Sequence, residues 1–316
     1  MFIRKAIEQF TVFYFSTCEL SEKTYQAYTG DLVQFQMFLD KNIKLSSITP
    51  EIIEDWAYDL KDKKYKPATI QRKLTSLKVF FNYWARKKKI SNSPFWKLKI
   101  NFGNSQALPK VLTHNEVERL LQVARREFSA FDYEDISQVG FGFLALRNLA
   151  IVETMFSTGM RVGEIVALNI EDFNSSDRSF LISGKGNKQR MGFVIDDYNF
   201  NILECYYNKL QKILPKSKAL FVNVFRHRIS TQGVANVVAK LSKKALIEKH
   251  ITPHMIRHTS ATMFLQNGAD IRVVQEFLGH SSITTTQRYT HISKEHLISQ
   301  LESFHPALKV TRNIPC

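Results

Sequence analysis

The segment TPHMIRHTSATMFLQNG (252–268) carries polar side chains that the packing of a helix alone does not explain. A capping threonine followed by proline opens it and a glycine closes it, which predicts one helix. On that helix His254 precedes Arg257 by three residues and His258 by four, so all three lie on neighbouring parts of one face near the N-terminus. A helix N-terminus already favours anions. The segment therefore predicts a site for a negatively charged group.

A second short helix is expected directly after it, opened by Asp270 and ended by Gly279. The next residue is His280, in a turn with two serines, and Tyr289 follows nine residues later. Consecutive threonines before this tyrosine are mediocre helix formers, so we expect Tyr289 on a short helix of low intrinsic stability.

Two ordinary interpretations compete with a site here. A tyrosine near a C-terminus is usually a packed or surface aromatic residue, and two histidines with one arginine usually form a solvated face. A zinc site of His254, His258 and His280 is disfavoured, because no glutamate follows the first histidine as in HExxH and the cysteines are distant.

Composition favours a folded protein with a polyanionic partner. The 316 residues suffice for two domains, 44% are hydrophobic, and the net charge is +15. The partner could be nucleic acid or an anionic membrane surface. No stretch approaches the ~20 apolar residues of a membrane-spanning helix, and the aromatic run at 11–15 is too short for a signal peptide core. The three cysteines are odd in number and widely spaced, which predicts free thiols in a reducing compartment, and hence a cytoplasmic chain.

Residues 1–100 are expected to form four helices, the last with a buried apolar stripe from Ile70 to Trp84. Residues 1–110 hold 19 Lys+Arg against 10 Asp+Glu, a net of +9, whereas the remainder holds 25 against 19, a net of +6. A small helical module with this surplus is typical of one half of a clamp on DNA. Its candidate DNA contacts are Arg72, Lys73, Lys78 and Arg86.

Residues 101–110 are polar and aperiodic, with one glycine and one proline, which predicts an interdomain linker. Further helices follow, with an irregular acidic and aromatic stretch at 127–141. The β signal is concentrated in two short strands, 180–182 and 191–195, joined by a turn that carries Lys185. The glycine-rich turn lacks the GxxxxGK[ST] spacing of a P-loop.

The polar residues singled out combine one nucleophile with cations and imidazoles, and no carboxylate cluster accompanies them to hold Mg²⁺. Such a set suits attack by a tyrosine on a phosphodiester, with arginines stabilising the non-bridging oxygens, so no metal and no cofactor is expected. A histidine could act as base, and the turn lysine could protonate the leaving 5′-oxygen. The set is Arg161, Lys185, His254, Arg257, His280 and Tyr289.

Four segments in order resemble motifs of the tyrosine recombinases, and within them the Xer-type and phage-integrase-like group. TGMRVGEI (158–165) resembles the first-arginine motif, which gives Arg161 as catalytic and Glu164 as supporting. GKGNKQR (184–190) resembles the hairpin lysine motif, which gives Lys185.

The other two segments complete the resemblance. HMIRHTSAT (254–262) is similar to the HxxR motif, which gives His254 and Arg257. LGHSSITTTQRYTH (278–291) is similar to the final histidine and nucleophile motif, which gives His280 and Tyr289.

The resemblance implies a mainly α fold in two domains: a helical core-binding (SAM-like) domain over 1–100, the linker 101–110, and an α-rich catalytic domain with a small antiparallel β-sheet over 111–316. It implies a C-shaped clamp on double-stranded DNA, a homo- or hetero-tetramer, a Holliday junction, and a C-terminal helix that packs on a neighbouring protomer. Residues 125–145 are longer than is usual in Xer-type members.

The Xer-like role implied is dimer resolution of a chromosome or plasmid in the bacterial cytoplasm, associated with the nucleoid and with a septal DNA translocase as a possible partner. A mobile-element integrase-excisionase is the first alternative. A type IB topoisomerase-like relaxing activity and a non-catalytic DNA-binding protein are the others.

Overall fold

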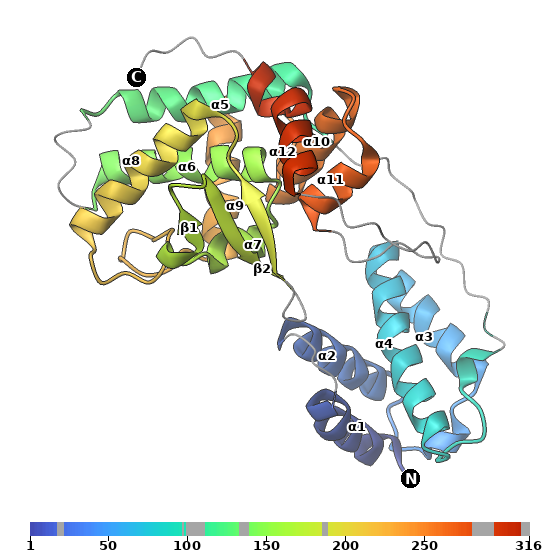
Figure 1. Cartoon of the computed structure of the whole chain (residues 1–316). Helices are drawn as coiled ribbons and strands as arrows, with labels where there is room; N and C mark the ends of the chain where they lie inside the picture. Colours follow the sequence, from blue (N-terminus) through green and yellow to red (C-terminus); the bar gives the residue numbers. More distant parts are fainter. Residues whose placement is uncertain are drawn as a thin grey trace. The chain divides into compact units, whose positions relative to one another are not determined.

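The computed structural model describes residues 1–17, 22–96, 98, 111–132, 139–184, 189–279 and 294–310. The chain divides into two compact units, Met1–Ala107 and Leu108–Cys316 (Figure 1). Each unit has its own hydrophobic core. The predicted linker 101–110 lies outside the described residues, so the exact domain boundaries stay a prediction. The predicted fold class, mainly α with one small antiparallel sheet, is confirmed.

The first unit is helical, as predicted. Its helices are α1 (Ile3–Thr17), α2 (Glu22–Phe38), α3 (Pro50–Asp62) and α4 (Pro67–Arg86), with 3₁₀ turns at Leu45–Ser47 and Pro94–Trp96. Proline in the first turn starts both α3 and α4, where its missing N–H costs nothing.

Aromatic side chains fill the core of this unit. The ring of Phe10 meets Phe80 edge-on at 5.2 Å, and Phe35 meets Trp56 edge-on at 5.1 Å. These rings come from all four helices, so their burial holds the bundle together.

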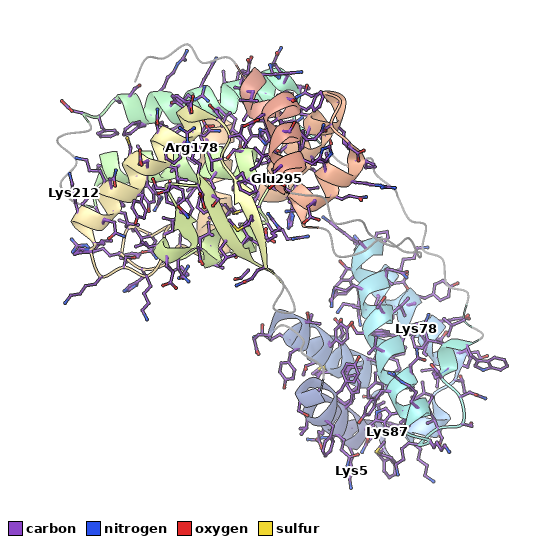
Figure 2. The ribbon with its side chains drawn as sticks, viewed as in Figure 1. Lys5, Lys78, Lys87, Arg178, Lys212 and Glu295 are labelled. Carbon is purple, nitrogen blue, oxygen red and sulfur yellow. The ribbon has the colours of Figure 1, made fainter. Side chains whose placement is uncertain are left out.

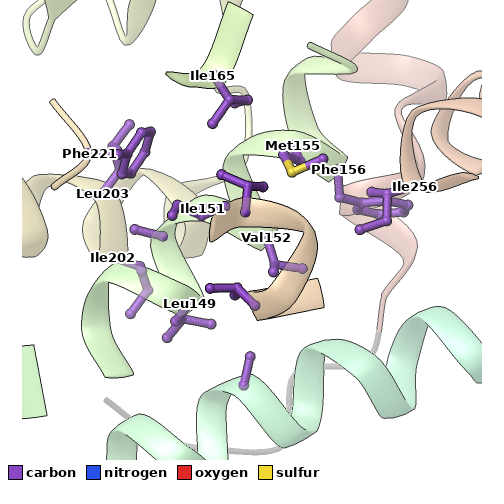
Figure 3. Packing of buried hydrophobic residues seen from close by; sticks show 14 of the residues in the cluster. Leu149, Ile151, Val152, Met155, Phe156, Ile165, Ile202, Leu203, Phe221 and Ile256 are labelled. Atoms are coloured by element: carbon purple, nitrogen blue, oxygen red, sulfur yellow. The ribbon is translucent and has the colours of Figure 1, made fainter. Parts of the chain in front are cut away.

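The second unit surrounds a long central helix, α6 (Phe141–Thr158), which is buried on almost every side. Its neighbours Ile165 and Ile256 come from two helices that follow it in sequence, and both residues share its core (Figure 3). The other elements of this unit are α5 (His114–Ser129), α7 (Val162–Ala167), α8 (Asp197–Ile213), α9 (Thr231–Lys244), α10 (Pro253–Gln266), α11 (Ile271–Leu278), α12 (Lys294–Phe304), and 3₁₀ turns at Ile170–Asp172 and Pro306–Lys309.

The sheet has three antiparallel strands in the order β1 (Phe173–Asn174), β2 (Ser179–Ser183) and β3 (Gln189–Phe193). The two predicted strands are therefore confirmed, with β3 beginning and ending two residues earlier than expected. In this register Ile182 pairs with Arg190, the second residue of β3. The turn with Lys185 lies outside the described residues.

Helix α12 packs on its own unit. Leu297 and Leu301 join a cluster with Phe264, Val274 and Phe277 of α10 and α11. The helix that the family resemblance assigns to a neighbouring protomer therefore buries its apolar side within the same chain here.

No helix in the described parts of the chain combines the length and the apolar character that crossing a bilayer requires.

The segment after α12 is anchored by a buried histidine. The ring of His305 is 2% exposed, lies 5.6 Å from the rings of Phe264 and Phe277, and accepts a hydrogen bond from the Ala307 N–H at 3.1 Å. Burial lowers the pKa of His305 from its usual 6.5 to about 4. The native state therefore holds this imidazole neutral.

This burial predicts acid sensitivity. Between pH 6.5 and 4 the unfolded chain binds a proton at His305 that the native state does not bind. The free energy of unfolding therefore decreases as the pH is lowered through this range, by up to about 3 kcal/mol. In His305→Gln, which can still accept the Ala307 bond, urea denaturation across this range should show a weaker pH dependence. His227→Gln, at an exposed position, should keep the wild-type profile. An unchanged pH dependence of stability in His305→Gln would contradict the lowered pKa of His305 as its cause.

Candidate active site

Helix α10 begins as its sequence predicts. The Thr252 side chain accepts a hydrogen bond from the Met255 N–H, and proline occupies the first turn. His254 and His258 are exposed near this end, whereas Arg257 is 7% exposed and turned into the unit. The three side chains thus start from one end of the helix, but only the histidines face solvent.

Arg257 connects the ends of two other helices. Its Nη1 donates to the Gly159 carbonyl at 2.5 Å and its Nη2 donates to the Leu278 carbonyl at 2.7 Å. Burial, with repulsion from Arg161, lowers the pKa of Arg257 from 12.5 to about 10, so it is charged at neutral pH. The guanidinium is therefore a buried cation in a fixed orientation.

Both connected helices end in a left-handed glycine. Gly159 ends α6 with φ of 58°, and Gly279 ends α11 with φ of 63°. A Cβ at Gly159 would lie 2.7 Å from the Phe277 ring, so glycine is needed there for space as well as for backbone conformation. The two turns bring carbonyl oxygens to the arginines.

Arg161 is held by Glu164 at the start of α7. The Glu164 carboxylate accepts from the Arg161 backbone N–H at 2.8 Å and from its Nη1 at 2.8 Å, while Nη2 donates to the Gly279 carbonyl at 3.2 Å. The Arg161 side chain remains 41% exposed. It is therefore oriented on one side and open to solvent on the other.

Glu164 also binds a third arginine. Nη2 of Arg190 lies 2.8 Å from Glu164 Oε2, and Nη1 of Arg257 lies 3.9 Å from the same oxygen. Burial raises the pKa of Glu164, but attraction to Arg190 and the hydrogen bonds from Arg161 outweigh it, and the pKa is held below its usual value. The carboxylate is thus ionised between three guanidiniums.

Arg190 is absent from the residues selected from sequence. The available signal was its place at the end of GKGNKQR, where a strand begins. Its partner Glu164 is 26 residues away, so no local pattern indicated the contact.

The structure brings three of the residues selected from sequence, Arg161, Glu164 and Arg257, together from α7 and α10. His254 lies exposed on the same α10 as Arg257. Lys185, His280 and Tyr289 lie outside the described residues. Arranged in this way, the guanidiniums can bind an oxyanion, since each has five N–H donors and the contacts above use only some of them.

The first unit carries the candidate DNA contacts on α4. Arg72, Lys78 and Arg86 are exposed there, and Figure 2 shows Lys78 at the surface of its helix. Both terminal nitrogens of Arg72 donate to the Asp31 carboxylate. Lys73 requires a correction: it is 7% exposed, and its Nζ donates to Asp31 at 2.8 Å and to Gln34 at 2.6 Å. This lysine neutralises a buried carboxylate and is not presented to a ligand.

Comparison with known families supports a single assignment. Residues 110–296 match the model of the phage integrase family, and residues 7–88 match that of the phage integrase N-terminal SAM-like domain. The chain belongs to the phage integrase family of tyrosine recombinases. It is accordingly a site-specific recombinase, which exchanges DNA strands by means of a tyrosine nucleophile.

Relatives of this recombinase include tyrosine recombinase XerC of Listeria monocytogenes serotype 4b, which is 34% identical over 307 residues covering 96% of the chain and 98% of the relative. Tyrosine recombinase XerD of Oceanobacillus iheyensis is 34% identical over 310 residues, covering 95% and 98%. A lambda integrase dimer (residues 75–356) bound to a COC′ core site is similar in fold, with a TM-score of 0.67 at 17% identity, covering 93% and 100%.

The glycine turn next to Arg257 gives a stability prediction. Gly159→Ala should lower the free energy of unfolding by about 1–3 kcal/mol, because alanine disfavours the left-handed conformation and its Cβ collides with Phe277. Gly163→Ala is the matched control, since a Cβ there meets nothing within 4 Å inside α7. The control should be neutral or more stable by up to about 1 kcal/mol. Urea denaturation measures the free energy of unfolding of both variants. Equal values for Gly159→Ala and Gly163→Ala would contradict the need for glycine at position 159.

Proposed function

We propose that this recombinase cleaves and rejoins duplex DNA at a defined site through a 3′-phosphotyrosyl intermediate, with Tyr289 as the nucleophile. The observation that carries the proposal is the convergence of Arg161 and Arg257 on one carboxylate, Glu164. Two fixed guanidiniums can bind the non-bridging oxygens of one phosphate. The proposal assigns them that role.

The chemistry follows from the residue types. The phenol oxygen of Tyr289 forms a bond to phosphorus while the bond from phosphorus to the 5′-oxygen breaks. His254 takes the phenol proton, and Lys185 gives a proton to the leaving 5′-oxygen. Arg161, Arg257 and His280 stabilise the non-bridging oxygens. One phosphoester replaces another, so rejoining needs no ATP.

The biological role proposed is Xer-like dimer resolution. XerC and XerD relatives are equally similar to the chain, so identity alone assigns it to neither. The partners proposed are double-stranded DNA and further protomers in a homo- or hetero-tetramer, at the nucleoid and with a septal DNA translocase. Mapping of binding sites on the host chromosome tests this role. A single palindrome-like site near the replication terminus supports it, and sites flanking a mobile element favour an integrase-excisionase.

Tyr289→Phe tests the nucleophile. On a nicked substrate, which loses the small fragment after cleavage, the wild-type chain should accumulate a covalent 3′-phosphotyrosyl adduct that resists denaturing electrophoresis. Tyr289→Phe should form none while binding DNA with similar affinity, because only the phenol oxygen is lost. Tyr58→Phe, at an exposed position of α3, should form the adduct at the wild-type rate. Adduct formation by Tyr289→Phe would remove Tyr289 from the role.

Lys185→Ala tests the general acid. It should slow cleavage of ordinary DNA by about 10²- to 10⁴-fold. A substrate with sulfur in place of the leaving 5′-oxygen needs no proton, so its cleavage by Lys185→Ala should approach the wild-type rate. Lys188→Ala, the other lysine of the same motif, should keep the wild-type ratio between the two substrates. Equal slowing of both substrates by Lys185→Ala would exclude the acid role.

A further inference from the structure

Arg190 is a charged residue at the centre of the site that the proposed chemistry does not use. It enters from β3, where its backbone pairs with Ile182, and its side chain is 12% exposed. Its Nη2 donates to Glu164 Oε2 at 2.8 Å. A guanidinium at this depth is costly unless it is paired, so its position requires a reason.

The stem of Arg190 also lies against the turn that holds Arg161. A Cβ at Gly279 would lie 2.5 Å from both Cδ and Nε of Arg190. The carbonyl of that same glycine accepts a hydrogen bond from Arg161 Nη2. Arg190 therefore contacts both groups that orient Arg161, the Glu164 carboxylate and the Gly279 turn.

One donor of Arg190 is unused within the described residues. Its Nη1 is buried and has no hydrogen-bond partner among them. The desolvation cost of a buried donor left without a partner is comparable to the net contribution of a hydrogen bond to a charged group, so Nη1 offsets much of what the Nη2 bond contributes. The ion pair with Glu164 therefore does not by itself account for the residue.

The charge of the cluster supplies a reason. Arg161, Arg257 and Glu164 alone carry a formal +1, and Arg190 raises the sum to +2. Glu276 also attracts Arg190, but it is exposed, so solvent screens its charge. A phosphodiester carries −1, and it approaches −2 when the tyrosine oxygen adds to phosphorus before the 5′-oxygen has left. A cluster of +2 therefore favours the transition state over the bound substrate, which is the condition for rate enhancement.

We propose that Arg190 is a positioning residue of the cleavage step. It fixes the Glu164 carboxylate and offsets its negative charge, so that this charge does not cancel the attraction of Arg161 and Arg257 for the phosphate. This rests on the proposed phosphotyrosine chemistry. Arg190 acts through Glu164 and the Gly279 turn and need not touch DNA.

Three variants separate this role from simple stability: Arg190→Gln, Arg190→Lys, and the control Arg178→Gln. Arg178 lies before β2 in the same sheet and pairs with the exposed Asp197. The readouts are the first-order rate of covalent adduct formation on a nicked substrate at saturating protein, the affinity for the uncleaved duplex, and thermal unfolding. Arg190→Gln should slow adduct formation by about 10- to 100-fold with affinity changed less than about threefold. Arg190→Lys should lose less, and Arg178→Gln should match wild type.

A charge-compensated double variant is the decisive measurement. Glu164→Gln with Arg190→Gln leaves Arg161 and Arg257, again a formal +2, and the amide oxygen can still accept from Arg161. We expect this double variant to form the adduct at least about fivefold faster than Arg190→Gln alone, a coupling within the usual range for groups in one network. If Arg190 only supported the fold, the rate losses of the two single substitutions would multiply in the double variant.

The outcomes are distinguishable. If the wild-type chain forms no adduct, the proposed function fails and this inference falls with it. If the wild type forms the adduct and Arg190→Gln forms it equally fast, or the double variant is slower than Arg190→Gln, the inference alone is overturned. If Arg190→Gln does not fold, the double variant is compared with wild type: adduct formation within about 20-fold of the wild-type rate supports the inference, and a slower rate overturns it.

Discussion

The carboxylate of Glu164 is the group on which the geometry of the site depends. Two unit charges 4 Å apart repel by about 4 kcal/mol at an effective dielectric constant of 20, so neighbouring guanidiniums do not gather unaided. Glu164 lies within 2.8 Å of Arg161 and Arg190 and 3.9 Å of Arg257. It also accepts the backbone N–H of Arg161 and so fixes where α7 begins. One acidic side chain thus sets both the local helix and the cation cluster.

Backbone carbonyls, together with the Glu164 carboxylate, orient the arginines of the site. Gly159 ends α6 and Gly279 ends α11, and their left-handed turns direct the oxygens of residues 159, 278 and 279 toward the arginines. A neutral carbonyl orients a guanidinium without cancelling its charge. The site therefore combines one anion, which permits the cations to approach each other, with several dipoles, which fix their direction and leave a net positive charge for a phosphate.

How far the sequence predicts this arrangement depends on the range of each interaction. Helix α10 was predictable because its cap, its proline and its final glycine are local signals, and so was the β2–β3 pairing. The burial of Lys73 was missed, although it lies three residues after Ile70 and four before Leu77, a spacing that places it beside the apolar stripe. Its partner Asp31 is 42 residues away. Arg190 was missed for the same reason, since the contact with Glu164 arises only in the folded unit.

The choice of arginine at position 257 follows from the burial of that position. Removal from water lowers the pKa of Arg257 from 12.5 to about 10, which leaves the side chain charged at neutral pH. If burial lowered the pKa of a lysine here by a similar amount, from its ordinary value of about 10.4, that pKa would lie close to neutral pH, and part of the lysine population would be uncharged. A lysine also presents a single ammonium, which cannot reach the Gly159 and Leu278 carbonyls in the planar geometry that the two nitrogens of Arg257 use. A cation buried at this depth, fixed on two turns and charged across the physiological range, must therefore be a guanidinium.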